Sequence, residues 1–176
     1  MIEKEISLLE IVIYGHPVLT QKADEINNIN EDIIKTAHNM VHTMHAASGI
    51  GLAAPQINRS IKLITVDLSV GKKAEDLIIL VNPEISKLEG QSIMEEGCLS
   101  IPDINEKVMR AFRVIVKGID LYGKHKTIEA EGLLARVFCH EIDHLNGKLF
   151  IDHLSALKKS LIKKKLRKRI ERNSLQ

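Results

Sequence analysis

The chain has few of the residues that mark specialised protein classes. It contains no tryptophan, two cysteines and four prolines among 176 residues, and only 3% of its residues are aromatic. Two cysteines are too few for the disulfide framework of a small secreted module. No run of about 18 apolar residues is present, so neither a membrane-spanning helix nor a membrane partner is expected. The N-terminal stretch lacks the basic and then apolar order of a signal peptide, which predicts a cytoplasmic protein.

What is present is the composition of an ordinary globular protein, with 44% hydrophobic and 27% charged residues. The length favours one domain. Charge is uneven along the chain, because residues 158–172 hold nine basic residues and one acid, a net charge of +8, whereas the whole chain carries +2. The rest of the chain is therefore acidic. We expect the basic segment either to bind a polyanion or to be a solvated helix.

Apolar periodicity predicts three helices. In the first, from about residue 29 to residue 46, apolar residues recur at helical spacing after Asn30, which can cap the helix. The other two predicted helices are residues 133–145 and 155 to about 173. Three histidines share a flank of the first helix without an acid or cysteine beside them, so a solvated face is expected there. They are His38, His42 and His45.

Short aliphatic and β-branched runs between glycine, proline, asparagine and serine residues predict strands. These runs are residues 61–67, 77–81, 113–121 and 126–131. The last two flank a Tyr-Gly-Lys turn typical of a hairpin. Grouped strands and few helices predict an α+β fold with a mainly antiparallel sheet.

The strongest chemical signal is the run His140-Glu141-Ile142-Asp143-His144. Histidines four residues apart lie on one helix face, about one turn apart, so both can bind one metal ion beside Glu141. A catalytic metal site needs a third protein ligand. The downstream candidates do not match the spacing of zinc peptidases, so an upstream cysteine is the alternative. Those candidates are Asp152, His153 and Glu171.

Two further clusters precede this motif. Residues 96–100 read Glu-Gly-Cys-Leu-Ser and supply Cys98, which taken alone is better explained as a buried core thiol. Residues 49–56 read Gly-Ile-Gly-Leu-Ala-Ala-Pro-Gln, where two glycines allow a backbone to approach closely. This segment lacks the Lys and Ser/Thr of a phosphate-binding loop, and a tight turn into a strand is the alternative.

Taken together and in this order, the three clusters resemble the peptide deformylase family over about residues 11–154. The family pattern is G-φ-G-φ-A-A-x-Q, where φ is apolar, then E-G-C-L-S, then Q-H-E-x-D-H-L-x-G. The chain departs from it at Cys139, which replaces the first Gln of the third motif. We expect mainly antiparallel sheets packed around a central metal-binding helix, with an N-terminal helix and a basic C-terminal helix. Residues 1–154 would form one catalytic domain, and residues 155–176 its basic helical extension.

The resemblance implies a metal-dependent hydrolase that removes the N-formyl group from the N-terminal methionine of newly made polypeptides and releases formate. The implied metal ligands are Cys98, His140 and His144. The implied physiological metal is Fe²⁺, for which Zn²⁺, Ni²⁺ or Co²⁺ can substitute. Two alternatives stay open: a zinc peptidase, which would cut internal bonds, and a non-catalytic ribosome- or RNA-binding protein, which would lack metal-dependent activity.

The resemblance also implies roles around the metal. Metal-bound water would attack the formyl carbon with Glu141 as general base and acid. The Gln56 side chain and the Leu99 backbone N–H would stabilise the oxyanion. Substrate would bind along the backbone of two residues and in an apolar pocket for methionine. The implied substrate-binding residues are Ile50, Gly51, Gly97 and Val137.

Further expectations concern partners and departures from the family. The basic C-terminal helix has a counterpart in some members, where it docks on the ribosome, and no DNA partner is expected. Arg136 stands where an apolar residue is expected, and we predict that its stem lines the rim of the pocket while its head reaches water. Asn105 replaces an Arg that many relatives use to hold substrate. Arg110 matches a family Arg, and we predict that it pairs with Glu96.

Overall fold

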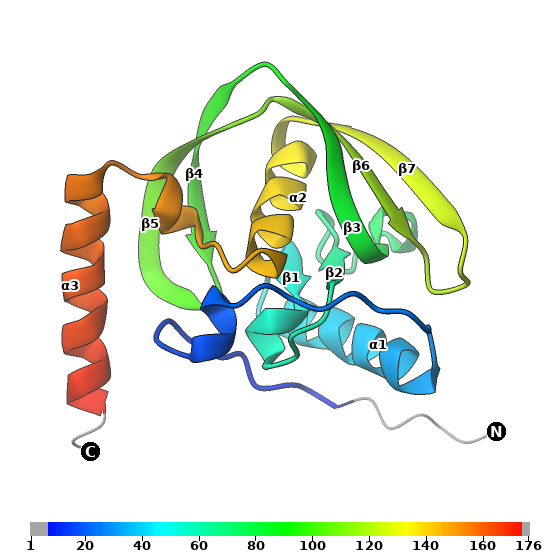
Figure 1. Cartoon of the computed structure of the whole chain (residues 1–176), viewed down its shortest axis with the longest axis horizontal. Coiled ribbons are helices and arrows are strands. Elements are labelled where there is room, and N and C mark those ends of the chain that lie inside the picture. Colours follow the sequence, from blue (N-terminus) through cyan, green and yellow to red (C-terminus); the bar gives the residue numbers. More distant parts are fainter. Residues whose placement is uncertain (1–6, 174–176) are drawn as a thin grey trace.

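The computed structural model describes residues 7–173 (Figure 1). Its helices are α1 (Glu31–Ala46), α2 (Gly132–Leu145) and α3 (Ala156–Asn173). Its strands are β1 (Gly51–Ala53), β2 (Leu63–Val66), β3 (Ile78–Glu89), β4 (Ser92–Cys98), β5 (Ile101–Arg110), β6 (Arg113–Ile119) and β7 (His125–Glu131). Short 3₁₀ turns complete it: η1 (Pro17–Thr20), η2 (Ala54–Ile57), η3 (Ala74–Asp76) and η4 (Phe150–His153).

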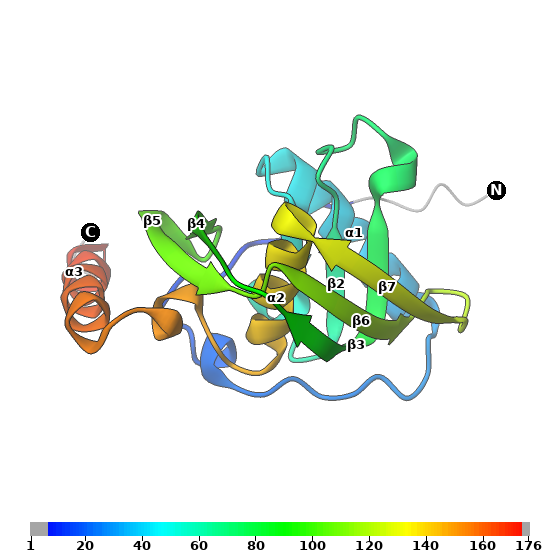
Figure 2. The same cartoon turned by 90° about the horizontal axis from the view of Figure 1, so that it is seen from above.

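The strands of this described part pair antiparallel in two sheets. One has five strands in the order β1-β2-β3-β6-β7, and the other is the β4–β5 hairpin. Both views place α2 between the larger sheet and this hairpin (Figures 1 and 2). The α+β prediction is confirmed. The strands β1, β4 and β5, which were not predicted, carry mixed small and charged residues rather than the β-branched runs on which the strand predictions relied.

Helix α1 begins as predicted. The side chain of Asn30 accepts a hydrogen bond from the backbone N–H of Ile33 at 3.0 Å, which satisfies one of the free donors of the first turn. Its buried apolar side chains recur at helical spacing and pack against β1 and β2. These side chains include Ile33, Ala37, Met40 and Met44.

Helix α2 is buried on most of its circumference. Ten of its fourteen residues are buried, and its Phe138 and Ile142 belong to the apolar core shared with the larger sheet. The helix starts at Gly132, whose φ of +58° is a conformation that glycine adopts without a steric penalty. Because most sides of α2 are buried, most of its polar side chains are buried too, and buried polar groups are normally hydrogen-bonded.

Helix α3 lies at the edge of the molecule, beyond the β4–β5 hairpin (Figure 2). Ile162 and Leu166 are its buried apolar anchors in a second core cluster, whereas Leu157 and Leu161 are 72% and 60% exposed. Within residues 7–173, each helix is too short or too polar to cross a bilayer.

Candidate active site

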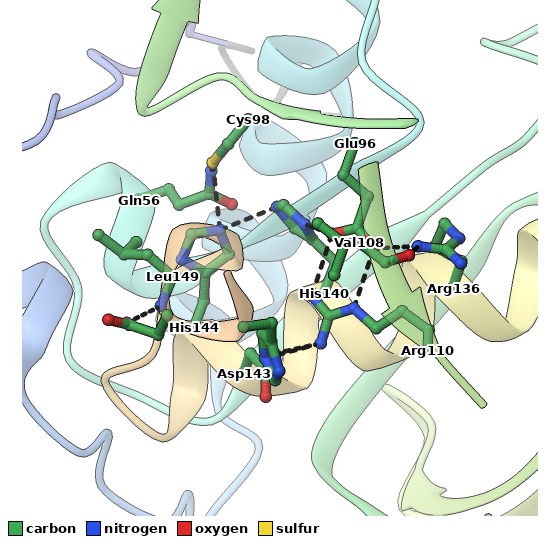
Figure 3. A network of polar contacts seen from close by, with 12 residues as sticks. Gln56, Glu96, Cys98, Val108, Arg110, Arg136, His140, Asp143, His144 and Leu149 are labelled. Atoms are coloured by element: carbon green, nitrogen blue, oxygen red, sulfur yellow. Dashed lines mark hydrogen bonds and ion pairs between the residues drawn. The ribbon is translucent and has the colours of Figure 1, made fainter. Parts of the chain in front are cut away.

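Three side chains that can bind a metal converge at the end of the hairpin. Cys98 is the last residue of β4, and α2 carries His140 and His144 one turn apart (Figure 3). The Sγ atom of Cys98 lies 3.4 Å from Nε2 of His144, which lies 3.2 Å from Nε2 of His140. In the described part of the chain, these three form the group of close Cys, His and acidic side chains that fits a metal ion. The histidines of α1 do not join it.

The donor set fits a tetrahedral metal. Bonds of about 2.0 Å to nitrogen and about 2.3 Å to sulfur separate tetrahedral ligand atoms by about 3.3–3.6 Å, close to the two distances above. Burial alone would raise the pKa of the Cys98 thiol, but the adjacent His144 and His140 outweigh burial and hold this pKa well below its usual value. Cys98 is therefore poised to ligate as a thiolate.

Glu141 lies beside these ligands and is buried. Its Oε2 atom has no hydrogen-bond partner among the described residues. Burial raises the pKa of Glu141 to about 7, although His140 and His144 oppose that rise. A side chain at Gly51 would collide with the Glu141 carboxylate and with Val137, so only glycine lets β1 come this close to α2.

The side chain of Gln56, in η2, extends toward Cys98. Its Oε1 accepts a hydrogen bond from the backbone N–H of Ala53 at 2.9 Å, which orients the amide. Its Nε2 then donates toward Ser100 Oγ at 3.3 Å and Cys98 Sγ at 3.5 Å. The amide donor is thus held in place before any substrate arrives.

These groups border a cavity of about 530 Å³. Ten residues were predicted for the site, and nine of them line this cavity while the tenth, His144, adjoins it through Cys98 and His140. The nine are Ile50, Gly51, Gln56, Gly97, Cys98, Leu99, Val137, His140 and Glu141. Leu133 also lines the cavity and was missed, although it stands one helical turn before Val137 and the same spacing argument would have found it.

The sequence model of the family described as Polypeptide deformylase matches residues 8–160. The chain belongs to the polypeptide deformylase family. The peptide deformylase of Thermodesulfovibrio yellowstonii is 50% identical over 161 residues, which are 92% of this chain and 98% of that relative. The peptide deformylase of Acidobacterium capsulatum is 48% identical over 158 residues, which are 90% of this chain and 93% of that relative.

Solved deformylase structures share the fold. A peptide deformylase from Legionella pneumophila superposes with a TM-score of 0.88 at 40% identity, covering 97% of this chain and 99% of that one. One from Synechococcus elongatus, solved in complex with actinonin, gives 0.84 at 38% identity, covering 89% and 86%. Members of this family are metal-dependent hydrolases that remove N-formyl groups from nascent polypeptides, and this deformylase is such an enzyme.

A buried carboxylate, Glu96, orients one of the candidate metal ligands of the deformylase, His140. Glu96 accepts two hydrogen bonds from Arg110, at 2.9 Å from Nε and 3.0 Å from Nη2, so the predicted Arg110–Glu96 pair is confirmed. Its Oε2 also lies 3.1 Å from Nδ1 of His140. Burial opposes ionisation, but His140 and Arg110 outweigh it and hold the pKa of Glu96 far below its usual value. An ionised Glu96 accepts from Nδ1–H of His140, which leaves Nε2 free to bind metal.

The prediction that the head of Arg136 reaches water is wrong. Its side chain is 2% exposed, and Nη1 donates to Glu96 Oε1 at 2.6 Å and to the Val108 carbonyl at 2.9 Å. Nη2 donates to the carbonyl and hydroxyl of Ser92 at 2.8 and 3.1 Å. The β4–β5 hairpin folds over α2 and supplies these acceptors, which offset the cost of burying the guanidinium. Periodicity along α2 alone could not show the covering hairpin.

The network around Glu96 extends through Arg110 to Asp143, whose side chain is 18% exposed (Figure 3). Arg110 also pairs with Asp143 of α2, which lies 2.6 Å from Nε2 of His153 in η4. His153 was a candidate third ligand, and in the fold it supports Asp143 instead. Cys139 is buried beside the network and does not join the metal-binding group.

Proposed function

We propose that Cys98, His140 and His144 of this deformylase hold Fe²⁺, with Zn²⁺, Ni²⁺ or Co²⁺ able to replace it. The observation that carries the proposal is the convergence of a thiolate, two imidazoles, a buried carboxyl and an oriented amide at one cavity. A divalent metal bound there would supply a Lewis acid that activates water near neutral pH. Residues of this chain would carry out the proton transfer and stabilise the oxyanion.

Glu141 would move the proton. Its carboxyl is buried beside the proposed ligands and can accept a proton from the attacking water and return it to the leaving amine. The Nε2 of Gln56 and the backbone N–H of Leu99 would donate hydrogen bonds to the oxyanion that forms at the formyl carbon. Because the Ala53 N–H already fixes the amide of Gln56, little reorganisation is needed in the transition state.

The peptide would bind as an added strand. β1 is the edge strand of the five-stranded sheet, and Ile50 and Gly51 line the cavity on that side. Gly97 lines it from the side of β4. An extended peptide lying between them can pair its main chain with both, while Val137 and Leu133 offer apolar surface to the methionine side chain. The substrate proposed is therefore the formyl-methionyl end of nascent polypeptides.

Formate release from formyl-Met-Ala-Ser tests this function. The enzyme is loaded anaerobically with Fe²⁺, or with Zn²⁺ in parallel, and compared with Glu141→Gln. We expect Glu141→Gln to keep the metal and to lose at least about 100-fold in rate, while Glu31→Gln on the exposed start of α1 changes neither. An unchanged rate in Glu141→Gln would rule out the role of the carboxylate, and metal-loaded wild type without formate release would contradict the whole assignment.

We also propose that helix α3 docks the enzyme on ribosomal RNA in the cytoplasm, where nascent chains emerge. The net charge of +8 over residues 158–172 supports a polyanionic partner. Residues 155–176 would then extend the catalytic domain of residues 1–154 as a docking helix. Replacing the exposed Lys164, Lys165 and Lys168 by Gln should reduce salt-sensitive co-sedimentation with ribosomes, and unchanged co-sedimentation would exclude this role.

A further inference from the structure

We propose that Arg169 of α3 positions the outer edge of the substrate cavity, so that the C-terminal helix contributes to peptide binding. The inference rests on the proposed function, because it takes the cavity to be the place where the peptide lies. Arg169 is a positioning residue here, since it lies outside the cavity and contacts residues that line it.

The contacts join α3 to the first residues of β5. Nη1 of Arg169 donates to the carbonyl of Pro102 at 3.2 Å, and Nη2 lies 3.0 Å from Oδ2 of Asp103. Pro102 and Asp103 both line the cavity. They follow the turn that carries Cys98 and Leu99, so one cation outside the cavity holds the edge next to the reacting groups.

The regular pairing of β4 with β5 is interrupted at this edge. The β4–β5 pairing joins Cys98 to Ile101 and Glu96 to Glu106, so the ladder is interrupted between these pairs. Asp103 has a φ of +62°, a backbone conformation that costs free energy in a residue other than glycine. A strained segment at such a register shift keeps one conformation only when surrounding contacts fix it.

Helix α3 is well placed to provide such a contact. Leu166 is buried in the same core cluster as Ile101 and Ile104 of β5, which fixes the helix against the strand. Arg169 follows Leu166 by three residues and therefore lies on the same helix face. At the other end of the helix, Lys158 pairs with Glu106 at 2.7 Å, and neither residue lines the cavity. The chain thus contains a matched ion pair that holds α3 on β5 without contacting the edge.

Loss of the Arg169 contacts should weaken binding and leave the chemical step intact. The reacting groups have their own supports, because Gln56 is fixed by Ala53 and the Ser100 carbonyl accepts from the backbone N–H of Tyr14 at 2.8 Å. The edge formed by Pro102 and Asp103 would become mobile, and the residues after the methionine would lose a defined surface. KM should therefore rise while kcat stays the same.

The test compares Arg169→Gln, Asp103→Asn and the double variant with Lys158→Gln as the control. Asparagine tolerates a positive φ, so Asp103→Asn removes the charge without adding strain. On formyl-Met-Ala-Ser we expect KM to rise about two- to fivefold in Arg169→Gln, the range of an exposed ion pair. Asp103→Asn should give a similar rise, the double variant no further rise, and Lys158→Gln no change. Formyl-Met-amide, which has no residue after the methionine, should show a smaller effect.

An unchanged KM in Arg169→Gln, or an equal rise in Lys158→Gln, would overturn the proposal, since the second result means that docking of α3 as a whole is what matters. The difference between wild type and Arg169→Gln should also shrink at high salt, which screens the pair. Failure of this inference leaves the wild-type deformylase active, whereas failure of the proposed function is seen as no formate release from the metal-loaded wild type. The two failures are therefore distinguishable.

Discussion

Helices α1 and α2 both carry two histidines four residues apart, yet their surroundings differ. His38 and His42 of α1 are exposed, whereas His140 and His144 of α2 are 9% and 1% exposed. Both pairs have the spacing that lets two imidazoles bind one metal. Only the pair on α2 has the thiol of Cys98 brought beside it by the β4–β5 hairpin, within the described residues. Histidine spacing along a helix is therefore not sufficient for such a site, and the fold brings the third candidate ligand, Cys98, beside the pair on α2.

Replacing one histidine on each helix should give the largest contrast. His140→Ala removes one of three ligands, so we expect bound metal to fall from one equivalent to nearly none. Activity should fall by more than the roughly 10–100-fold that loss of an outer partner of a metal ligand costs. His42→Ala should change neither. Metal content by elemental analysis and formate release measure both, and metal retained in His140→Ala would contradict the ligand set.

Gly51→Ala should be nearly as damaging while sparing the metal. A Cβ atom at this position collides with the Glu141 carboxylate, so either β1 or Glu141 must shift. Displacing a catalytic group by about 1 Å can cost about 100-fold in rate. We expect kcat to fall by that order with metal content unchanged. Gly123→Ala in the β6–β7 turn, where no atom lies close but φ is +81°, is the control for a glycine replacement that strains the backbone away from the site. Full activity in Gly51→Ala would show that the close approach is not needed.

Breaking a buried ion pair of α2 should cost more stability than breaking an exposed ion pair of α1. Arg136→Leu on α2 removes four hydrogen bonds to buried or partly buried acceptors, one of which is Glu96. We expect it to lower the free energy of unfolding by about 3 kcal/mol, as breaking a buried pair does. Arg59→Gln removes an exposed pair with Asp32 of α1 and should cost at most about 1 kcal/mol. Urea unfolding measures both, and equal losses would mean that burial adds nothing to the Arg136 pair.

The sequence predicted the parts of this molecule that depend on local pattern. The Asn30 cap, the apolar stripe of α1 and the helix that carries His140 and His144 follow from neighbouring residues, and the structure has them. The Arg110–Glu96 pair was inferred as well. The motif match nominated Gln56 and Cys98, although nothing local could show that they lie 3.5 Å apart.

The parts that the sequence did not predict depend on tertiary packing. The head of Arg136 was expected in water because helical spacing says nothing about the hairpin that covers α2. Asp143 had no predicted role beyond its place in the metal motif. Its ion pair with Arg110 forms because β5 lies beside α2. Leu157 and Leu161 are apolar residues of α3 that stay exposed, because α3 contacts the core through Ile162 and Leu166. In each case a neighbouring element decided the environment.

The third histidine of α1 gives the smallest expected effect. His45 Nε2 lies 2.8 Å from Asp67, a buried carboxylate. Burial opposes ionisation of Asp67, but hydrogen bonds from Ser69, Gly71 and His45 outweigh it and lower its pKa to about 2. A folded-state pKa below the unfolded value means that Asp67 stabilises the protein above about pH 4 and loses that contribution as the pH falls toward 2.

Asp67→Asn should therefore flatten the acid limb of the stability profile. Between pH 5 and pH 2.5, we expect the wild type to lose about 1–2 kcal/mol more than Asp67→Asn does, measured from urea midpoints with and without the substitution. Glu75→Gln, an exposed change in the same loop, should leave the wild-type profile unchanged. Parallel profiles for wild type and Asp67→Asn would show that the hydrogen bonds from Ser69, Gly71 and His45 do not hold the carboxylate ionised.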